Sequence, residues 1–132
     1  MENLKGIGKI IFIPKTENTY SLKPHHFLIN QTPEGFEVID IECGLVTFDF
    51  KDVFTAIKNL GDMIIDHAIS NIKKIGIENY EKLYNLDDSL ITEYNFRKEL
   101  FDRIKQTTPD TTKEVKTKDF TSTVKYSLRN VA

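Results

Sequence analysis

The first fifty residues alternate apolar and polar positions in short runs separated by turn residues, a pattern typical of β-strands. Residues 6–13 form the first run, which Pro14 ends. The strongest hairpin signal is Thr-Pro-Glu-Gly at 32–35, because proline presets the backbone at the second turn position and glycine tolerates positive φ. Another run follows at 45–50. We therefore predict an antiparallel meander of three or four strands.

Apolar residues then recur at three- and four-residue spacing, which predicts one long helix. We expect Asp49 to cap its start and Gly76 to end it. The apolar side chains span an arc of roughly 200°, wider than the ~100° stripe that one covering surface requires. We therefore expect a later helix or a second copy of the chain to cover part of this helix. The candidate interaction residues on it are Leu60, Met63, Ile64 and His67.

The helical pattern continues through residues 77–107, where Glu93 and Arg97 are expected to pair on the exposed side. Residues 106–118 carry almost no apolar side chains and are predicted to be a flexible linker. Residues 119–132 alternate again, as a half-buried strand does. This strand must pair either with the N-terminal sheet or with a partner subunit. Its candidate interaction residues are Phe120, Val124, Tyr126 and Leu128.

These elements predict an α+β fold: an N-terminal antiparallel meander packed on a long central helix, a further helical segment and a C-terminal strand. Residues 1–105 are expected to form one domain, which suits a chain of 132 residues. A hydrophobic content of 39% excludes a wholly disordered or collagen-like chain.

The charge pattern and the cysteine count limit the class of protein further. A net charge of −2 supplies no strong global field toward nucleic acid or an acidic membrane. The apolar-rich segment 53–72 is interrupted by charges, so we expect no membrane span. The apolar run 10–13 is too short for the core of a signal peptide. Cys43 is the single cysteine and fits a reducing compartment. We expect a cytoplasmic protein of bacterial or phage origin.

Few side chains suggest chemistry. His25 and His26 are neighbours on a predicted strand and point to opposite faces, so they cannot easily share a metal ion. Asp40, Glu42 and Asp49 form an acidic cluster of the kind that holds Mg²⁺ in two-metal nucleases, although a capping role explains Asp49. The sequence has neither a P-loop nor a dinucleotide-binding glycine motif. We expect no catalytic residue, metal ion or cofactor.

The C-terminal tail carries basic residues with aromatic residues between them. Such a strand can contact phosphates, but neighbouring acidic residues partly cancel its charge. A plain exposed strand face is therefore favoured over a nucleic-acid interface. The candidate nucleic-acid contacts are Lys116, Lys118, Lys125 and Arg129.

One stretch of the chain has a familiar arrangement. Its parts are the hairpin Phe27-Leu28-Ile29…Pro33-Glu34-Gly35-Phe36-Glu37-Val38, the strand Leu45-Val46-Thr47, and a helix opened by acidic residues that carries Ala56. Residues 27–65 thereby resemble the HicB antitoxins, whose core is similar to a truncated ribonuclease H domain. The family's Pro-Asp-Leu-Pro-Gly turn is replaced by residues 39–44, and Phe48 stands where the family has glycine. The resemblance implies a protein that inhibits a toxin by covering its active surface.

These observations favour a small non-enzymatic binding or inhibitor protein that acts by oligomerisation and by sequestering a partner. The expected partners are a second copy of the chain and a protein, either a toxin or, for a phage counter-defence protein, a host defence protein. A small nucleotide trapped between subunits and a nucleic acid are further possibilities. The alternatives are a metal-dependent nuclease-like enzyme using Asp40, Glu42 and Asp49, and a structural protein of a phage.

Overall fold

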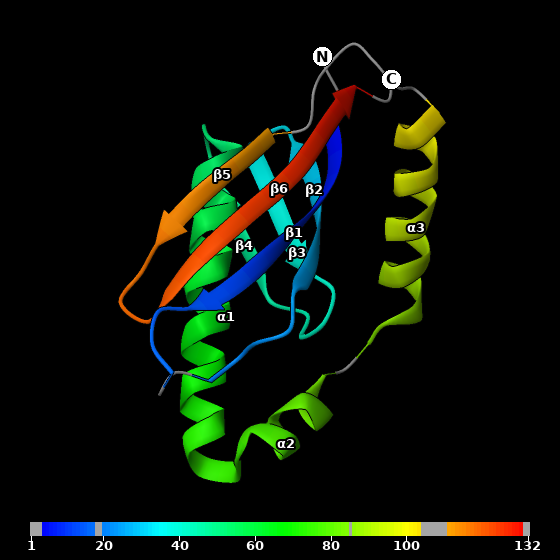
Figure 1. The fold of residues 1–132 in the computed structure, drawn as a ribbon. Coiled ribbons are helices and arrows are strands. Elements are labelled where there is room, and N and C mark those ends of the chain that lie inside the picture. Colours follow the sequence, from blue (N-terminus) through cyan, green and yellow to red (C-terminus); the bar gives the residue numbers. More distant parts are fainter. Residues whose placement is uncertain (1–3, 18–19, 85, 104–110, 131–132) are drawn as a thin grey trace.

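A computed structural model describes residues 4–17, 20–84, 86–103 and 111–130. The α+β class is confirmed, with the predicted N-terminal strands, long helix and C-terminal strand (Figure 1). The elements are β1 (Leu4–Pro14), β2 (His25–Thr32), β3 (Gly35–Asp40), β4 (Val46–Asp49), α1 (Val53–Ile75), α2 (Ile77–Tyr80), the 3₁₀ helix η1 (Glu81–Leu83), α3 (Asp88–Arg103), β5 (Thr111–Lys116) and β6 (Phe120–Asn130).

The strands form one antiparallel sheet in the order β4-β3-β2-β1-β6-β5. The first four strands are the predicted meander, and the Thr32–Gly35 turn joins β2 to β3. Strand β6 pairs with β1 along its whole length, from Leu4 opposite Asn130 to Pro14 opposite Phe120. The C-terminal strand therefore returns to the sheet of its own chain, which is one of the two alternatives left open by its pattern.

Strand β5 corrects the prediction of a linker over residues 106–118. Thr111–Lys116 pair with β6, so the prediction is wrong for them, whereas 106–110 lie outside the described residues. In β5 the half-buried Val115 packs against the core, and the other side chains are threonines and charged residues. This composition is usual for the edge of a sheet, where charged side chains discourage pairing with other chains. Backbone hydrogen bonding to β6 keeps Thr111–Lys116 in the sheet, because this segment lacks the alternating apolar side chains of the other strands.

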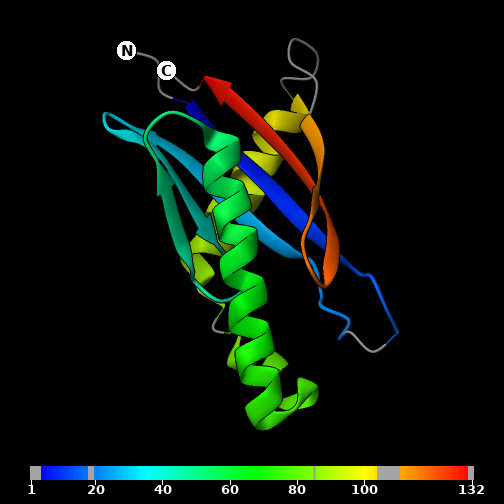
Figure 2. The ribbon, with the colours of Figure 1, turned by 90° about the vertical axis from the view of Figure 1, so that its left-hand side faces the viewer.

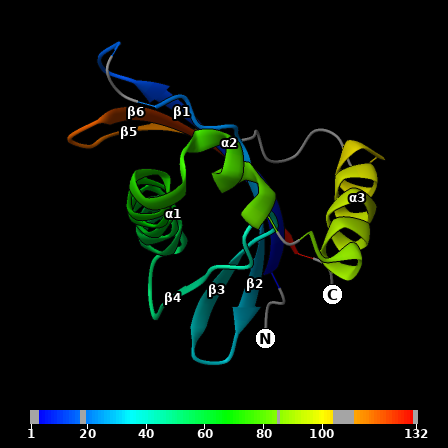
Figure 3. The same ribbon diagram turned by 90° about the horizontal axis from the view of Figure 1, so that it is seen from below.

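Helix α1 lies in the bend of the sheet, with β3 and β4 on one side and β1, β5 and β6 on the other (Figures 2 and 3). A Cβ added at Gly61 would lie 3.7 Å from the end of the Ile10 side chain, an ordinary contact distance, so β1 packs against the helix at this point. Most of the wide apolar arc is covered because the sheet curves around the helix, whereas Met63 and Ile75 remain exposed. The residues of α1 that are buried are Ala56, Ile57, Leu60, Gly61, Ile64, Ile65, Ala68 and Ile72.

The predicted C-terminal end of α1 agrees with the structure, whereas its predicted N-terminal cap does not. Asp52, not Asp49, is the N-terminal cap, and its carboxylate accepts a hydrogen bond from the Phe54 amide at 3.2 Å. The predicted cap is wrong because Asp49 still belongs to β4, and its carboxylate instead accepts from the Lys51 and Asp52 amides. Gly76 ends the helix as predicted, with φ of 82° and its amide donating to the Ile72 carbonyl at 2.8 Å.

Helix α3 lies on the opposite face of the sheet, over β1 and β2 (Figure 3). A second, smaller core forms there from Ile7, Leu28 and Phe101. Arg97 is only 5% exposed, so the prediction that it lies on the exposed side of the helix is wrong. Its carboxylate partner Glu93 is present, but the guanidinium also reaches the sheet. Within the described residues, no helix has both the length and the apolar character needed to cross a membrane.

Candidate functional site

A row of polar side chains crosses the sheet on the α3 face. Thr112 on β5 lies opposite Lys125 on β6, Lys125 lies opposite Lys9 on β1, and Lys9 lies opposite His26 on β2. Because partners directly opposite in a sheet project to the same face, these four side chains form one continuous row. Two neighbouring members of the row carry the same positive charge.

Helix α3 encloses this row on one side and adds Tyr94 and Lys98 to it. The resulting cleft has a volume of about 440 Å³. Three lysines contribute to its wall, together with hydroxyl-bearing residues, and no Asp, Glu or Cys is among the described residues that line it. The lining consists of Ile7, Gly8, Lys9, His26, Tyr94, Lys98, Thr112, Lys125, Tyr126 and Ser127. We call it the basic cleft.

Glu42 holds the imidazole of His26 at the edge of the basic cleft. Its carboxylate accepts one hydrogen bond from the His26 amide at 2.7 Å and a second from His26 Nδ1 at 2.8 Å. The ring of Tyr94 stands edge-on to His26, with the ring centroids 5.4 Å apart. These contacts fix the imidazole and leave Nε2 as its remaining polar atom.

A more apolar hollow of about 280 Å³ adjoins the basic cleft and shares His26 and Tyr94 with it. Ile41, Leu86 and Ile91 supply apolar lining, and Glu42 and Asn95 supply polar groups. Burial, with a smaller contribution from Glu42, raises the pKa of Tyr94. The Tyr94 hydroxyl therefore stays protonated at neutral pH and can donate a hydrogen bond.

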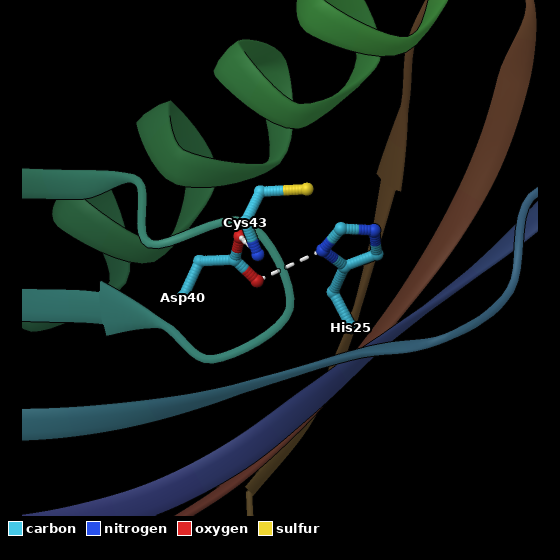
Figure 4. A group of neighbouring side chains, drawn as sticks. All are labelled: His25, Asp40 and Cys43. Atoms are coloured by element: carbon cyan, nitrogen blue, oxygen red, sulfur yellow. Dashed lines mark hydrogen bonds and ion pairs between the residues drawn. The ribbon is translucent and has the colours of Figure 1, made fainter. Parts of the chain in front are cut away.

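A second constellation lies on the α1 face, at the end of the sheet where β2 begins and β3 ends (Figure 4). His25 and Asp40 are 1% and 0% exposed, and His25 Nδ1 lies 2.8 Å from Asp40 Oδ1. Asp40 Oδ2 accepts a hydrogen bond from the Cys43 amide at 2.9 Å. One donor atom from each of these three side chains lies within 4.8 Å of the others, which is close enough for a shared metal ion.

Two tyrosines extend this cluster toward α1. The Tyr84 hydroxyl lies 3.1 Å from His25 Nε2, and the Tyr80 hydroxyl lies 3.2 Å from His67 Nδ1. Tyr80 is also hydrogen-bonded to Cys43. These contacts tie α2 and η1 to the end of the sheet.

Burial, followed by the charge of Asp40, raises the pKa of the Cys43 thiol from 9.0 to about 11. Burial also raises the pKa of both Tyr80 and Tyr84. All three groups are therefore protonated at neutral pH. A protonated thiol is a poor nucleophile, so Cys43 is not arranged for nucleophilic catalysis.

Most of the predicted interaction residues lie inside the molecule. Leu60 and Ile64 on α1, and Phe120 and Val124 on β6, are at most 2% exposed. They belong to the core of the single chain, as do the half-buried Tyr126 and Leu128 packed against it. His67 is half-buried, and Met63 is 38% exposed. The argument from an uncovered helix is therefore weakened for Leu60 and Ile64 but not for the exposed Met63, and a homo-oligomer stays a prediction.

The acidic cluster proposed for a nuclease does not assemble. Asp40 and Glu42 lie close together, since Glu42 Oε1 is 4.0 Å from the same His25 nitrogen that Asp40 contacts. Asp49 pairs with Phe36 near the opposite end of β3 and is occupied at the turn before α1. The three carboxylates therefore do not face one point, as a two-metal centre requires.

The predicted nucleic-acid residues do not form one surface. Lys125 lines the basic cleft, whereas Lys118 lines a different hollow that also contains Asp62, Asp66 and Asp119. Lys116 lies 4.0 Å from Glu114, and the Arg129 guanidinium lies over the ring of Phe101. One member of the predicted set, Lys125, thus belongs to the candidate site.

The sequence patterns missed Lys9, Lys98, His26 and Tyr94 as parts of one site. Alternation along β1 places Lys9 on the face opposite Ile10, but it does not say which strand lies beside it. The pairing of β1 with β6 brings Lys9 and Lys125 together across 116 positions of sequence separation (125 − 9).

Comparisons of this chain with models of protein families, with curated proteins and with solved structures gave no match.

Proposed function

We propose that this protein is a non-enzymatic binding protein that captures a small phosphate-bearing ligand, a nucleotide, in the basic cleft. The observation that carries the proposal is the convergence of Lys9, Lys98 and Lys125 on one cleft. Like charges directly opposite in a sheet are destabilising, so Lys9 beside Lys125 lowers the stability of the folded chain. A bound anion removes this repulsion.

The chemistry of the cleft matches a phosphate group. Lysine ammonium groups bind phosphate as point charges, and hydroxyl groups donate hydrogen bonds to its oxygens. Thr112 and Ser127 supply hydroxyls beside the lysines. Carboxylates are absent from the described lining, so the positive field is not neutralised within the cleft.

The adjoining hollow supports a nucleotide over a bare phosphate. Apolar side chains and the ring of Tyr94 suit a planar base, while Glu42 can accept and Asn95 can accept or donate hydrogen bonds at its polar edge. His26 and Tyr94 stand where the two spaces meet. The cleft alone falls within the range of about 300–1,000 Å³ typical of small-molecule sites.

The sequence-based hypothesis placed a nucleotide between two subunits, whereas the basic cleft is formed by one chain. A protein partner, whether a toxin or a host defence protein, and the resemblance to HicB antitoxins stay predictions.

The test is calorimetric titration of the full chain with ATP, with inorganic pyrophosphate and with adenosine. We expect ATP to bind more tightly than pyrophosphate, adenosine to bind weakest, and added salt to weaken ATP binding. Replacing Lys125 with glutamine should weaken ATP binding at least about tenfold, since a hydrogen bond to a charged group contributes about 1.5–3 kcal/mol.

Lys73→Gln is the matched control, because Lys73 is exposed in the last turn of α1, away from the cleft. Equal loss of affinity in both variants would show nonspecific charge attraction and would contradict the proposal. The proposal would also be contradicted if the full chain bound neither ATP nor pyrophosphate.

A further inference from the structure

The buried cluster of His25, Asp40 and Cys43 offers a nitrogen, an oxygen and a sulfur donor. Zinc and related divalent transition metals accept this mixture, whereas magnesium and calcium take oxygen ligands. We propose that these three side chains bind one divalent transition-metal ion of the zinc class. The proposed metal site lies on the α1 face of the sheet and is separate from the basic cleft.

The backbone holds the three donors close together before any ion binds. His25 is the first residue of β2 and Asp40 is the last residue of β3, while Cys43 lies in the turn that follows. The turn is closed by hydrogen bonds from the Gly44 amide to the Asp40 carbonyl at 3.1 Å and from the Asp40 amide to the Leu45 carbonyl at 2.7 Å. The donors therefore come from rigid elements.

Groups behind the donors orient them as outer-shell partners do in metal sites. Tyr84 lies 3.1 Å from His25 Nε2, the ring nitrogen that does not face Asp40. Asp40 uses its second oxygen for the Cys43 amide, which leaves Oδ1 directed at His25 Nδ1. Such contacts to the far side of a ligating histidine fix its tautomer and ring orientation.

The charges around the cluster also favour a cation. Asp40 is completely buried, and Glu42 Oε1 lies 4.0 Å from His25 Nδ1. In the described structure, the ion pairs of both carboxylates are made with histidines, not with lysine or arginine. A water molecule can complete a four-coordinate set, since both carboxylate oxygens of Glu42 already accept hydrogen bonds from His26.

Binding has a defined proton balance. The ion takes the Nδ1 electron pair of neutral His25, whose proton is then carried on Nε2 and donated to the Tyr84 oxygen. The Cys43 thiol loses its proton to solvent when the sulfur binds. One proton per ion is thus released from neutral donors, and metal binding is tighter at higher pH.

The experiment is titration of the metal-free full chain with cobalt(II) chloride, followed by zinc chloride. We expect one equivalent of cobalt to produce sulfur-to-cobalt charge-transfer absorption in the near ultraviolet, zinc to abolish it, and either ion to raise the melting temperature. Cys43→Ser should remove the absorption and weaken binding at least tenfold while keeping the metal-free melting temperature within a few degrees.

His67→Asn is the matched control, because His67 contacts Tyr80 but lies outside the donor set. It should retain the cobalt absorption. The proposal is overturned if the wild-type chain gives no sulfur-to-cobalt absorption, if His67→Asn loses it as fully as Cys43→Ser does, or if the absorption persists after unfolding in urea. None of these outcomes bears on ATP binding in the basic cleft.

Discussion

On the α1 face, the polar side chains at the end of the sheet are paired with one another, whereas on the α3 face neighbouring side chains carry the same charge. His25 and Asp40 are almost inaccessible and joined at 2.8 Å. Lys9 and Lys125 lie directly opposite each other at the wall of an open cleft. A buried polar group without a partner is costly, while an exposed charge is solvated by water. The pairing on the first face therefore stabilises the fold, whereas the unpaired positive charge on the second face fits the ligand that we propose.

Arg97 combines a feature of the α1 face with a position beside the basic cleft. Its guanidinium is buried like the groups on the α1 face, yet it belongs to the helix that walls the basic cleft. It donates hydrogen bonds to the carbonyls of Gly6 and Ile29 and to Asn30 Oδ1, at 3.1, 2.9 and 2.7 Å. Substitutions of Asp40, Arg97 and Lys125 should therefore separate effects on folding stability from effects on ligand binding.

The largest effect is expected for Asp40→Ala. Removing this carboxylate leaves His25 Nδ1 and the Cys43 amide without their acceptor, as happens when one member of a buried pair is deleted. We expect a loss of about 3–5 kcal/mol in the free energy of unfolding, measured by urea denaturation in metal-free buffer. Glu34→Ala, at an exposed turn position, should change it by less than about 0.5 kcal/mol. A similar small change in Asp40→Ala would refute the stabilising role of the pair.

A smaller loss is expected for Arg97→Ala. The carbonyls that it contacts lose a charged donor, so we expect about 2–3 kcal/mol of destabilisation and faster amide hydrogen exchange along α3. ATP binding should weaken as well, because Tyr94 and Lys98 lie on this helix. Arg103→Ala removes an exposed pair with Glu99 on the same helix and should leave both properties nearly unchanged. If the two variants behave alike, Arg97 does not anchor α3.

Lys125→Thr should increase the free energy of unfolding, unlike the two preceding substitutions. Replacing one of two facing lysines with a β-branched residue is expected to raise the free energy of unfolding by about 0.2–1 kcal/mol at low salt, while ATP binding weakens. Added salt should shrink the gain in stability, because it screens the repulsion that the substitution removes. Destabilisation at low salt would show that Lys125 is held by favourable contacts and would remove the contrast between the two faces.

A final effect appears only at alkaline pH. Since the pKa of the Cys43 thiol is 9.0 ordinarily and about 11 in the fold, the folded chain keeps a proton that the unfolded chain releases between these pH values. The free energy of unfolding should therefore fall as pH rises from 9 toward 11, and this thiol contributes no change below pH 9. Cys43→Ala should flatten the fall in metal-free buffer. The raised pKa values of Tyr80 and Tyr84 act in the same direction at higher pH. An equal slope in both proteins would contradict the assignment to Cys43.

Local features were predictable wherever a few neighbouring residues determine the backbone. The Thr32–Gly35 turn, the end of α1 at Gly76 and the strand alternation after Phe120 all agree with the structure. The predictions were wrong where strand pairing with a distant segment overrode a local preference such as helix capping. Asp49 is a suitable cap by its chemistry, but its backbone is still engaged with β3.

The candidate sites were only partly predictable. The sequence singled out His25, His26, Asp40 and Glu42, and the structure shows that each acidic residue pairs with one of the histidines. It did not predict that Cys43 would join His25 and Asp40, because that requires the turn after β3 to fold back toward β2. Arg97 looked like an exposed helix residue because its i,i+4 partner Glu93 is visible in the sequence, while its carbonyl partners are not.

By itself, the sequence determined the α+β class and, apart from β5, the types of the main elements and their order along the chain, because hydrophobic period, capping residues and turn residues act over a few positions. Only the tertiary structure decided that the sheet curves around α1 and covers most of its wide apolar arc, that Thr111–Lys116 joins the edge, and that Lys9 meets Lys125. The physical reason is that strand pairing and sheet curvature depend on contacts between residues far apart in the chain, which no local pattern encodes.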